Sequence, residues 1–284
     1  MRLATGSYVG DGTDGRQITG VGFQPDVVFI KSEEARPGVA RTSTMAGDAA
    51  KVLDSTGLLQ ANLIESLGVD GFTVGTDDGV NKSGKTYYWV AMKAGSDLSV
   101  GTYVGNGSDN RSITGVGFQP VWVVTLGDGE DSAFRPASLL GDNSYLMAAD
   151  GKLANRIQAM EVTGFQIGSD ANVNKSGTTY HYIAWAASSR VSEGSYTGDG
   201  SDNRSITGVG FQPQMVWVKR DDTKPSTWRP ASVAGDSTLY WKAQVPQADR
   251  IQVLEADGFQ VGANDEVNKG GKPHYYLALR DGGP

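Results

Sequence analysis

Apolar residues gather in short runs along this chain rather than in long helical stripes. Runs rich in β-branched and aromatic residues occupy positions 26–31, 121–126 and 214–219, and a proline precedes each of them. Runs this short, bounded by Pro and Gly, are typical of strands. Because apolar residues fall on consecutive positions, each run predicts a central strand of a sandwich that is buried on both faces.

The sequence around these runs predicts several more strands in each copy. We expect a hairpin between GFTVGTD at residues 71–77 and the aromatic strand that follows, with its turn at residues 80–84, where Asn and Gly suit a positive φ. The segment at residues 155–162 fits either a strand or a short helix. Seven or so short strands in about 94 residues fit a β-sandwich. The closing aromatic strands are residues 86–93, 179–186 and 273–280.

One octapeptide, ITGVGFQP, occurs three times, at Ile18–Pro25, Ile113–Pro120 and Ile206–Pro213. Other equivalent positions are also 93 to 95 residues apart. Solenoid repeats have periods of roughly 20 to 50 residues, so a unit of this length is a small domain. The sequence therefore predicts an all-β protein of three tandem β-sandwich domains, each of about 94 residues. We call them the first, second and third repeats, at residues 1–94, 95–187 and 188–284.

The repeated frame also resembles a known kind of domain. It opens with GSYVGDGTDGRQITGVGFQPDVVFIK and closes with GFTVGTDDGVNKSGKTYYWVAM in the first repeat, and all three repeats match this pattern. The pattern is similar to a small domain of uncharacterised function found in virion proteins of tailed bacteriophages. That family pairs a Tyr-x-Gly-Asp/Asn-Gly start and a Gly-Phe-x-Pro step with a closing Gly-Phe-x-x-Gly and Tyr strand. The resemblance implies a structural or surface role in a phage particle.

Composition narrows the partners that we expect. The 38% of hydrophobic residues is enough for packed cores, and the formal net charge of −7 argues against a nucleic-acid surface, which needs clustered Lys and Arg. There is no cysteine, which excludes disulfides and thiolate metal sites. No apolar run approaches the roughly 18 residues of a membrane span. We therefore expect no nucleic-acid partner and no membrane partner.

Residues suited to catalysis are scarce. The two histidines, His181 and His274, occupy the closing strand, where the first repeat has Tyr88 and Tyr87 at the equivalent positions. A histidine that a sister copy replaces with tyrosine is interpreted as a strand residue rather than a catalytic base. No nucleophile elbow, phosphate-binding loop or metalloprotease helix occurs in the sequence. The sequence thus predicts a protein that is not an enzyme and has no cofactor.

Acidic turns raise the question of calcium. The segments GDGTDG and GDGSDN contain hard oxygen ligands at Asp11, Asp14, Asp199 and Asp202. Asn106 replaces the first of these aspartates in the second repeat, and the spacing matches no EF-hand loop. Asp and Asn side chains also bond to their own turn backbone, and we prefer this interpretation to a metal site.

Several side chains recur at one position in every repeat. An arginine occurs six residues before a Gly-Asp pair. It could form an anion or sugar site, or it could serve as a structural ion pair or a clamp on the backbone. We favour the structural role, because the forked guanidinium group can donate several hydrogen bonds at once. We expect the recurring asparagines to be turn residues and the recurring phenylalanines and tyrosines to be core anchors. The residues are Arg41, Arg135 and Arg229; Asn81, Asn174 and Asn268; Phe23, Phe118 and Phe211; Tyr8, Tyr103 and Tyr196.

Other segments differ between the copies. Loops that diverge on a common frame are where sibling domains meet different neighbours, so we expect partner contacts there. Glycan stacking is an additional interpretation for Trp228 or Trp241, but most of the six tryptophans lie in expected strands and are interpreted as core residues. The candidate partner-binding residues are Glu33, Arg36, Asp128, Glu130, Arg220, Lys224 and Trp228.

These features favour a non-enzymatic structural protein at the surface of a phage virion. Three copies in one chain suit a pseudo-trimer at a three-fold position of an icosahedral shell, which favours a head decoration or cement protein. Its expected partner is the major capsid protein, another virion protein or a second copy of the chain. The alternative is a tail fibre or a receptor-binding carbohydrate-binding module in which each repeat offers a sugar site.

Overall fold

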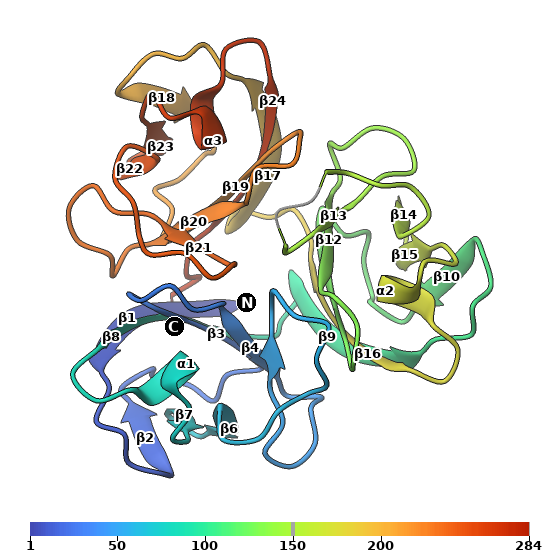
Figure 1. The fold of residues 1–284 in the computed structure, drawn as a ribbon. Coiled ribbons are helices and arrows are strands. Elements are labelled where there is room, and N and C mark those ends of the chain that lie inside the picture. The colour runs from blue at the N-terminus through green and yellow to red at the C-terminus, as the bar shows by residue number, and fades with distance from the viewer. Residues whose placement is uncertain (149–150, 284) are drawn as a thin grey trace.

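The computed structural model describes residues 1–148 and 151–283, and nearly all of its regular structure is β. Three β-sandwiches follow one another along the chain, and every sheet contains strands of a single repeat. Each sandwich has one five-stranded and one three-stranded antiparallel sheet, and a four-residue helix connects two of its strands (Figure 1). The all-β fold of three tandem domains expected from the sequence is confirmed.

The first repeat sets the pattern of strands. Its helix α1 (Asp78–Asn81) connects the strand β7 (Gly71–Val74) to the strand β8 (Thr86–Lys93). The five-stranded sheet has the order β1 (Arg2–Val9), β8 (Thr86–Lys93), β3 (Val27–Ser32), β4 (Val39–Thr42) and β5 (Lys51–Val52). The three-stranded sheet has the order β2 (Arg16–Thr19), β7 (Gly71–Val74) and β6 (Ile64–Gly68).

The second and third repeats have the same strand order, with the helices α2 (Ala171–Asn174) and α3 (Asp265–Asn268). In the second repeat, the five-stranded sheet has the order β9 (Leu98–Val104), β16 (Thr179–Trp185), β11 (Trp122–Gly127), β12 (Ala133–Pro136) and β13 (Tyr145–Leu146). Its three-stranded sheet has the order β10 (Arg111–Thr114), β15 (Gly164–Ile167) and β14 (Ile157–Glu161). In the third repeat, the five-stranded sheet has the order β17 (Val191–Thr197), β24 (Pro273–Leu279), β19 (Met215–Arg220), β20 (Thr227–Pro230) and β21 (Leu239–Tyr240). Its three-stranded sheet has the order β18 (Arg204–Thr207), β23 (Gly258–Val261) and β22 (Ile251–Glu255).

The hairpin predicted from residues 71–77 is wrong, because β7 and β8 belong to different sheets. The Asp77 side chain accepts a hydrogen bond from Gly79 N at 2.6 Å and so caps α1. This single helical turn carries the chain from one sheet to the other. The ambiguous segment at residues 155–162 is a strand, since β14 pairs with β15 there.

The recurring octapeptide forms a strand and a turn in each sandwich. In the first repeat Ile18 and Val21 are buried in the core, while Gly20 and Gly22 have φ angles of 85° and 82°, which favour glycine. The Asp70 carboxylate accepts hydrogen bonds from the N–H groups of both glycines, at 3.1 and 2.6 Å. The octapeptide recurs because each sandwich contains this same strand and turn.

One face of each five-stranded sheet packs on the three-stranded sheet of its own repeat, and we call it the inner face. Each repeat has a separate buried core at its inner face. The same residue types occupy many equivalent positions in the three cores. Recurring members are Ile18, Ile113 and Ile206; Phe72, Phe165 and Phe259; and Val80, Val173 and Val267.

The opposite face of each five-stranded sheet, which we call the axial face, packs against the other two repeats around a pseudo-three-fold axis (Figure 1). One continuous core with residues from all three repeats fills this region. The ring centroid of Trp217 lies 5.2 Å from that of Trp122 and 4.8 Å from that of Phe134, both in the second repeat. Phe29 of the first repeat lies 5.1 Å from Trp241 of the third. Sister repeats therefore cover the second face of each central strand.

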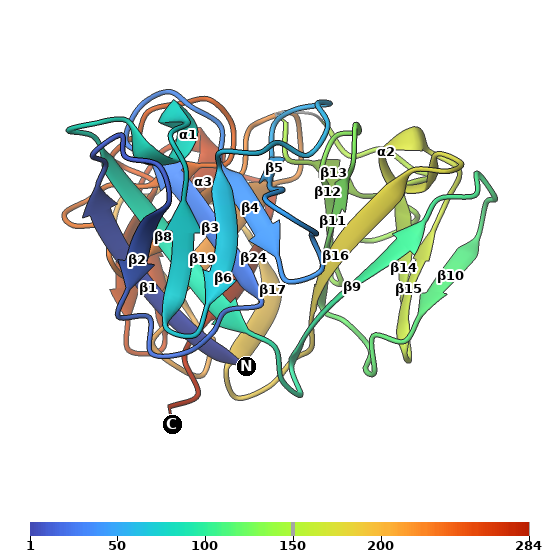
Figure 2. The same ribbon diagram turned by 90° about the horizontal axis from the view of Figure 1, so that it is seen from below.

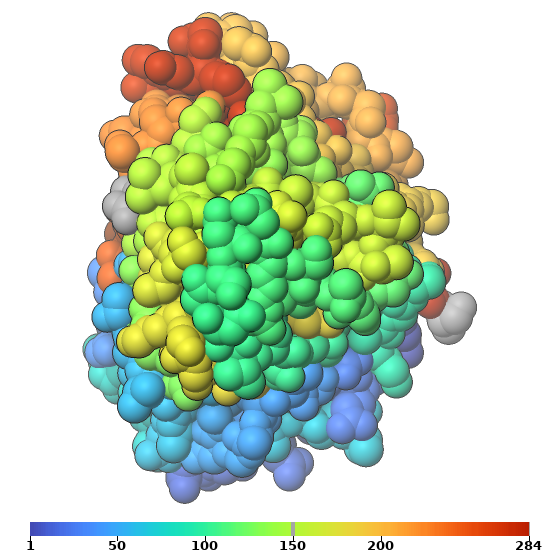
Figure 3. Space-filling model, turned by 90° about the vertical axis from the view of Figure 1, so that its right-hand side faces the viewer, coloured from blue at the N-terminus to red at the C-terminus, as the bar shows by residue number. Residues whose placement is uncertain are grey.

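The ring of repeats has two different ends. Figure 2 shows α1, α2 and α3 at one end, the helix end, and both chain termini at the other, the terminal end. Seen from the side, the second repeat packs closely on the first and third (Figure 3). None of the helices in the described part of the chain is long and apolar enough to cross a membrane.

Candidate functional site

The recurring arginines are buried clamps on the backbone. Arg229 Nη2 donates to the carbonyl oxygens of Val233 at 3.0 Å and Gly235 at 2.6 Å, and its Nη1 donates to that of Ser237. Its counterparts in the first and second repeats bind the equivalent carbonyls. A planar fork of donors fits this loop of carbonyls, as a lysine would not. The geometry matches the backbone clamp that we favoured over an anion site.

The recurring asparagines are buried and fasten a loop to the helix of each sandwich. Asn81 Nδ2 donates to Thr13 O at 2.8 Å, and its Oδ1 accepts from Asp11 N at 3.0 Å. Asn174 and Asn268 make the equivalent bonds. The expectation of ordinary turn residues is therefore corrected: each asparagine ends a helical turn, and its side chain holds the acidic loop.

The acidic segments form the turns expected from their composition. Asp11 Oδ1 accepts from Thr13 N at 2.9 Å, and Asp199 Oδ1 accepts from Ser201 N at 2.8 Å. Among the described residues, no group of three or more His, Cys, Asp or Glu side chains is placed to hold a metal ion.

Phe23 and Phe211 are buried core anchors, and each lies under an arginine. Arg2 Cζ lies 4.9 Å from the ring centroid of Phe23, and Arg280 Cζ lies 5.0 Å from that of Phe211. The long arginine side chains cover the rings and add a cation–π attraction.

Phe118 of the second repeat is only half-buried, so the prediction of a fully buried anchor is wrong there. The strand register places Asp97 and Ala186 at the positions that Arg2 and Arg280 occupy in the other repeats. Neither residue has a long cationic side chain. The ring of Phe118 therefore lacks the cover that its two counterparts have.

A stacked aromatic pair recurs beside each helix. Tyr8 stacks on Tyr87 with centroids 5.2 Å apart, and Tyr196 stacks on His274 at 5.0 Å. Tyr103 and Tyr180 form the equivalent pair at 5.1 Å. Burial lowers the pKa of His274 to about 4, so its ring is neutral near pH 7. Tyr8 and Tyr103 are buried anchors as predicted, whereas Tyr196 is half-buried.

His181 lies at the contact between the first and second repeats. Its Nδ1 is 2.7 Å from Thr44 Oγ1, and burial lowers the pKa of its imidazole to about 4. Both histidines therefore act as buried structural groups, as we interpreted them from the sequence.

The divergent loops contact sister repeats. In the loop between β11 and β12, Asp128 Oδ1 accepts from Leu59 N at 2.9 Å, and Glu130 O accepts from Lys51 Nζ at 2.7 Å. Lys51 is fully buried, and this burial lowers its pKa to about 8. The expectation of an external partner at Asp128 and Glu130 is corrected, because the first repeat occupies this position.

The same kind of contact continues around the ring. In the loop between β19 and β20, Asp221 accepts from Tyr145 Oη at 2.6 Å and from Lys152 Nζ at 2.8 Å, both in the second repeat. In the loop between β3 and β4, Gly38 N donates to Trp241 O of the third repeat at 2.6 Å. Each of these loops thus reaches a neighbouring repeat, and the three contacts form a closed cycle.

Trp228 and Trp241 are fully buried in the axial core, where their rings stack with centroids 4.2 Å apart. The prediction of a partner contact at Trp228 is wrong, and neither ring is exposed for glycan stacking, because each ring covers the other. Both belong to the core, the role expected for most of the tryptophans. Their divergence from the first two repeats reflects packing at the axis.

The remaining candidates have unequal exposure. Arg220 is buried and donates from Nη1 to Asp265 O at 2.6 Å, so the expectation of a free partner-binding side chain is corrected. Arg36 is half-buried and pairs with Asp78, while Glu33 is half-buried and Lys224 is exposed.

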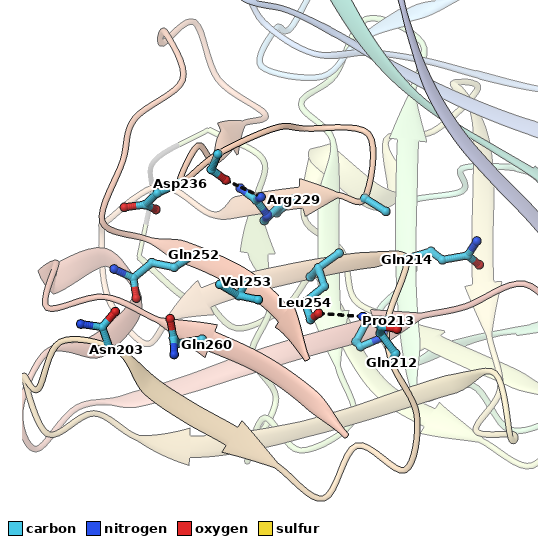
Figure 4. Close-up of a pocket in the computed structure, with 12 residues that line it drawn as sticks. Asn203, Gln212, Pro213, Gln214, Arg229, Asp236, Gln252, Val253, Leu254 and Gln260 are labelled. Atoms are coloured by element: carbon cyan, nitrogen blue, oxygen red, sulfur yellow. Dashed lines mark hydrogen bonds between the residues drawn. The ribbon is translucent and has the colours of Figure 1, made fainter. Parts of the chain in front are cut away.

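A groove recurs beside the clamp in each sandwich. Its lining always includes the Gln-Pro step of the octapeptide and the clamp arginine, and its volume is about 360, 550 and 740 Å³ in the first, second and third repeats. The third groove is lined by several side-chain amides (Figure 4). These amides are Asn203, Gln212, Gln214, Gln252 and Gln260.

The sandwich that carries the groove is also recognised by comparison with protein families. Residues 3–102 and 187–282, more than half of the chain, match the model of a family described as a domain of unknown function, DUF7483. The chain belongs to this family. The two DUF7483 matches cover the first and third repeats, and the family's description names no activity. No curated protein matches the chain.

Two features of this DUF7483 protein were not found from the sequence. The groove amides are scattered along the third repeat, and Gln252 and Gln260 lie beside each other because β22 pairs with β23. Asp97, in a joint that looks like a plain polar linker, is buried and accepts from Ser188 Oγ at 2.9 Å and Arg190 Nε at 2.8 Å. It also binds the Met1 nitrogen, and it therefore ties all three repeats together at the terminal end.

Proposed function

We propose that the protein is a non-enzymatic structural protein of a bacteriophage virion, which decorates the head at three-fold positions of the capsid lattice. The observation that carries this proposal is the closed pseudo-three-fold ring of three like sandwiches around one shared core. A three-fold lattice position presents three equivalent surfaces, and the ring presents three equivalent surfaces to it. The resemblance of the repeated frame to phage virion domains supports the same role.

The surface suited to the lattice is the terminal end of the ring. The turns between β6 and β7 and between β14 and β15 carry the exposed apolar residues Val69 (84% exposed) and Val162 (77% exposed). The third repeat has the exposed Ala256 at the equivalent turn. The Arg2 and Asp70 bonds to Gly22 hold the first of these turns beside the start of β1. We call these three turns the tips. Three tips on one ring bind a lattice jointly, which raises the overall affinity without large individual contacts.

Retention on particles tests the proposal. The intact protein is added to phage particles assembled without it, and the bound fraction is measured after sedimentation. We expect the double variant Val69→Asp and Val162→Asp to lose retention by at least about tenfold, because two of three contacts gain a charge. The matched control is Val9→Asp with Val104→Asp, which changes equally apolar residues, 56% and 55% exposed, at the helix end. Failure of the unaltered protein to bind particles, or equal loss in both double variants, would contradict the proposal. Retention on host cell-envelope glycan instead would favour a tail fibre or receptor-binding module.

A further inference from the structure

The groove of the third repeat differs in chemistry from its two counterparts. The second groove is lined by small apolar residues, and the first by charged ones such as Asp26 and Lys93. In the third, five of the twelve lining residues have amide side chains, and its volume is the largest of the three, at about 740 Å³. The alanines of the second groove are Ala137, Ala159, Ala186 and Ala187.

Three of the amides converge at one end of the third groove. Figure 4 shows Asn203, Gln252 and Gln260 with their side chains pointing toward one another. Gln252 Nε2 donates to Asp202 Oδ1 at 3.0 Å, whereas Gln252 Oε1 is buried and has no hydrogen-bond partner within the described chain. No hydrogen bond involves the Gln260 side chain among the described residues, and it is only half-buried. Asn203 Nδ2 donates to Asp202 Oδ2 at 2.8 Å, so the Gln260 amide and Gln252 Oε1 are the groups without partners at this end.

Between the two ends of the groove the lining is apolar. Pro213, Val253 and Leu254 lie there, and Val253 is 47% exposed. The charged groups nearby bind the backbone: Arg229 donates to carbonyls from Nη1 and Nη2, which leaves only its buried Nε without a partner in the described chain, and Asp236 accepts from Asp249 N at 3.0 Å. Amides around an apolar strip, without free charge, suit a neutral ligand with hydroxyl groups and C–H faces.

A peptide strand is a poorer match for the same place, although β22 is an edge strand. An added strand would need the backbone groups of β22. Thr238 Oγ1 already accepts from Ile251 N and donates to Ile251 O, both at 3.0 Å. Gln212 Nε2 donates to Leu254 O at 3.0 Å. The edge is therefore capped, and only side chains are left for recognition.

From this arrangement we infer that the third repeat binds a neutral oligosaccharide in the groove between its Gln-Pro step and β22. The amides at residues 203, 252 and 260 bond to sugar hydroxyls, and Val253 with Leu254 contacts a sugar C–H face. The second repeat has amides at the equivalent positions, Asn110, Gln158 and Gln166, but Ala159 and Met160 replace Val253 and Leu254 there and the groove is smaller. The first repeat has Glu65 and Thr73 in place of the two glutamines. We therefore expect the sugar site in the third repeat, where the amides and the apolar strip occur together. The inference is independent of the lattice role, because the tips at the terminal end form a different surface.

Calorimetric titration of the intact protein tests this site. The probes are linear malto-, cello-, xylo- and chito-oligosaccharides. We expect at least one of them to bind, and we expect Gln260→Ala and Gln252→Ala each to weaken that binding about three- to tenfold, the effect of one lost hydrogen bond. Val253→Arg fills the groove and should abolish binding.

The matched control is Gln166→Ala. Gln166 has the same strand position in the second repeat as Gln260 has in the third, since they pair with Ser112 and Ser205. Its removal should leave the affinity unchanged. The inference is overturned if none of the four oligosaccharide series binds, if Gln166→Ala weakens binding as much as Gln260→Ala, or if Val253→Arg binds normally. Thermal unfolding of each variant confirms that it is folded.

Discussion

The two faces of the five-stranded sheets show how one sequence frame meets two different demands. On the inner face, many equivalent positions keep the same residue in all three repeats, and most of the others change little in size. On the axial face, equivalent positions differ widely in size, although they belong to the same strands. Inner-face examples are Val28, Val123 and Val216, and Ala91, Ala184 and Ala278; axial examples are Ala40, Phe134 and Trp228, and Val27, Trp122 and Met215.

Shared volume explains this difference. Each inner core belongs to one repeat, so three copies can hold the same residues without affecting one another. The axial core is a single close-packed space that all three repeats fill. A large residue from one repeat leaves room only for a small one from another: a Cβ atom on Gly38 of the first repeat would lie 2.9 Å from Trp241 Cε3 of the third. The axial residues therefore differ between the repeats because they pack against one another in a single core.

The largest expected effect comes from truncating an axial aromatic. Trp217→Ala should cost about 3–5 kcal/mol of unfolding free energy, because Trp217 contacts Trp122, Phe134 and Trp241. Amide hydrogen exchange should show protection falling in all three repeats. Trp89→Ala serves as control, since Trp89 packs on Phe72 in the inner core of the first repeat and should affect mainly that repeat. Protection lost only in the third repeat of Trp217→Ala would mean that the axial core does not couple the repeats.

Making the axis more symmetric should also destabilise the protein. Ala40→Trp copies the third repeat's residue into the first and overfills the shared core, at a cost of about 1–3 kcal/mol. Copying across the inner face should cost less: Ile30→Val, which introduces the Val218 of the third repeat, removes one methylene for about 0.5–1.5 kcal/mol. Urea denaturation measures both. An Ala40→Trp variant as stable as the unaltered protein would show unfilled space at the axis.

Within the inner face, the predicted anchors should separate according to their cover. Phe211→Ala should cost about 3–5 kcal/mol, the range for buried phenylalanine. Phe118→Ala should cost less, by about 1–2 kcal/mol, because a half-buried ring loses less contact area. Thermal unfolding midpoints compare them. Equal losses would mean that Phe118 is as well covered as Phe211.

The smallest effect is a loss of acid sensitivity. His274 has a pKa of about 4 when folded, below its ordinary 6.5, because it is buried. Between these values the unfolded chain binds a proton that the folded chain does not, so stability falls as the pH drops through this window. His274→Tyr installs the residue of the other two stacked pairs. Its stability relative to the unaltered protein should rise by about 1 kcal/mol between pH 7.5 and pH 5.5, measured by chemical denaturation at about these two pH values. A pH dependence identical to that of the unaltered protein would show that His274 is not the titrating group.

Much of the fold was predictable because it repeats. The octapeptide, the clamp arginines and the Tyr8 position mark local structures that every sandwich needs. The axial packing was not predictable, since consecutive apolar residues indicate burial on two faces but do not show what covers them. The connection at α1 was mistaken for a hairpin because one helical turn shows no helical periodicity. The amide groove depends on the register of β22 and β23, which a strand pattern alone does not give.

The joint between Leu3 and Asp281 has a consequence for chain connectivity. Leu3 N donates to Asp281 Oδ1 at 2.9 Å, so the beginning of the first repeat touches the end of the third. The other two joints are tight turns, with Gly95 bridged to Leu98 and Ser188 to Val191. A circular permutant cut in either turn and joined through a short linker across the Leu3 contact should fold to the same ring. The fold of the ring therefore does not depend on which of the three sandwiches comes first in the chain.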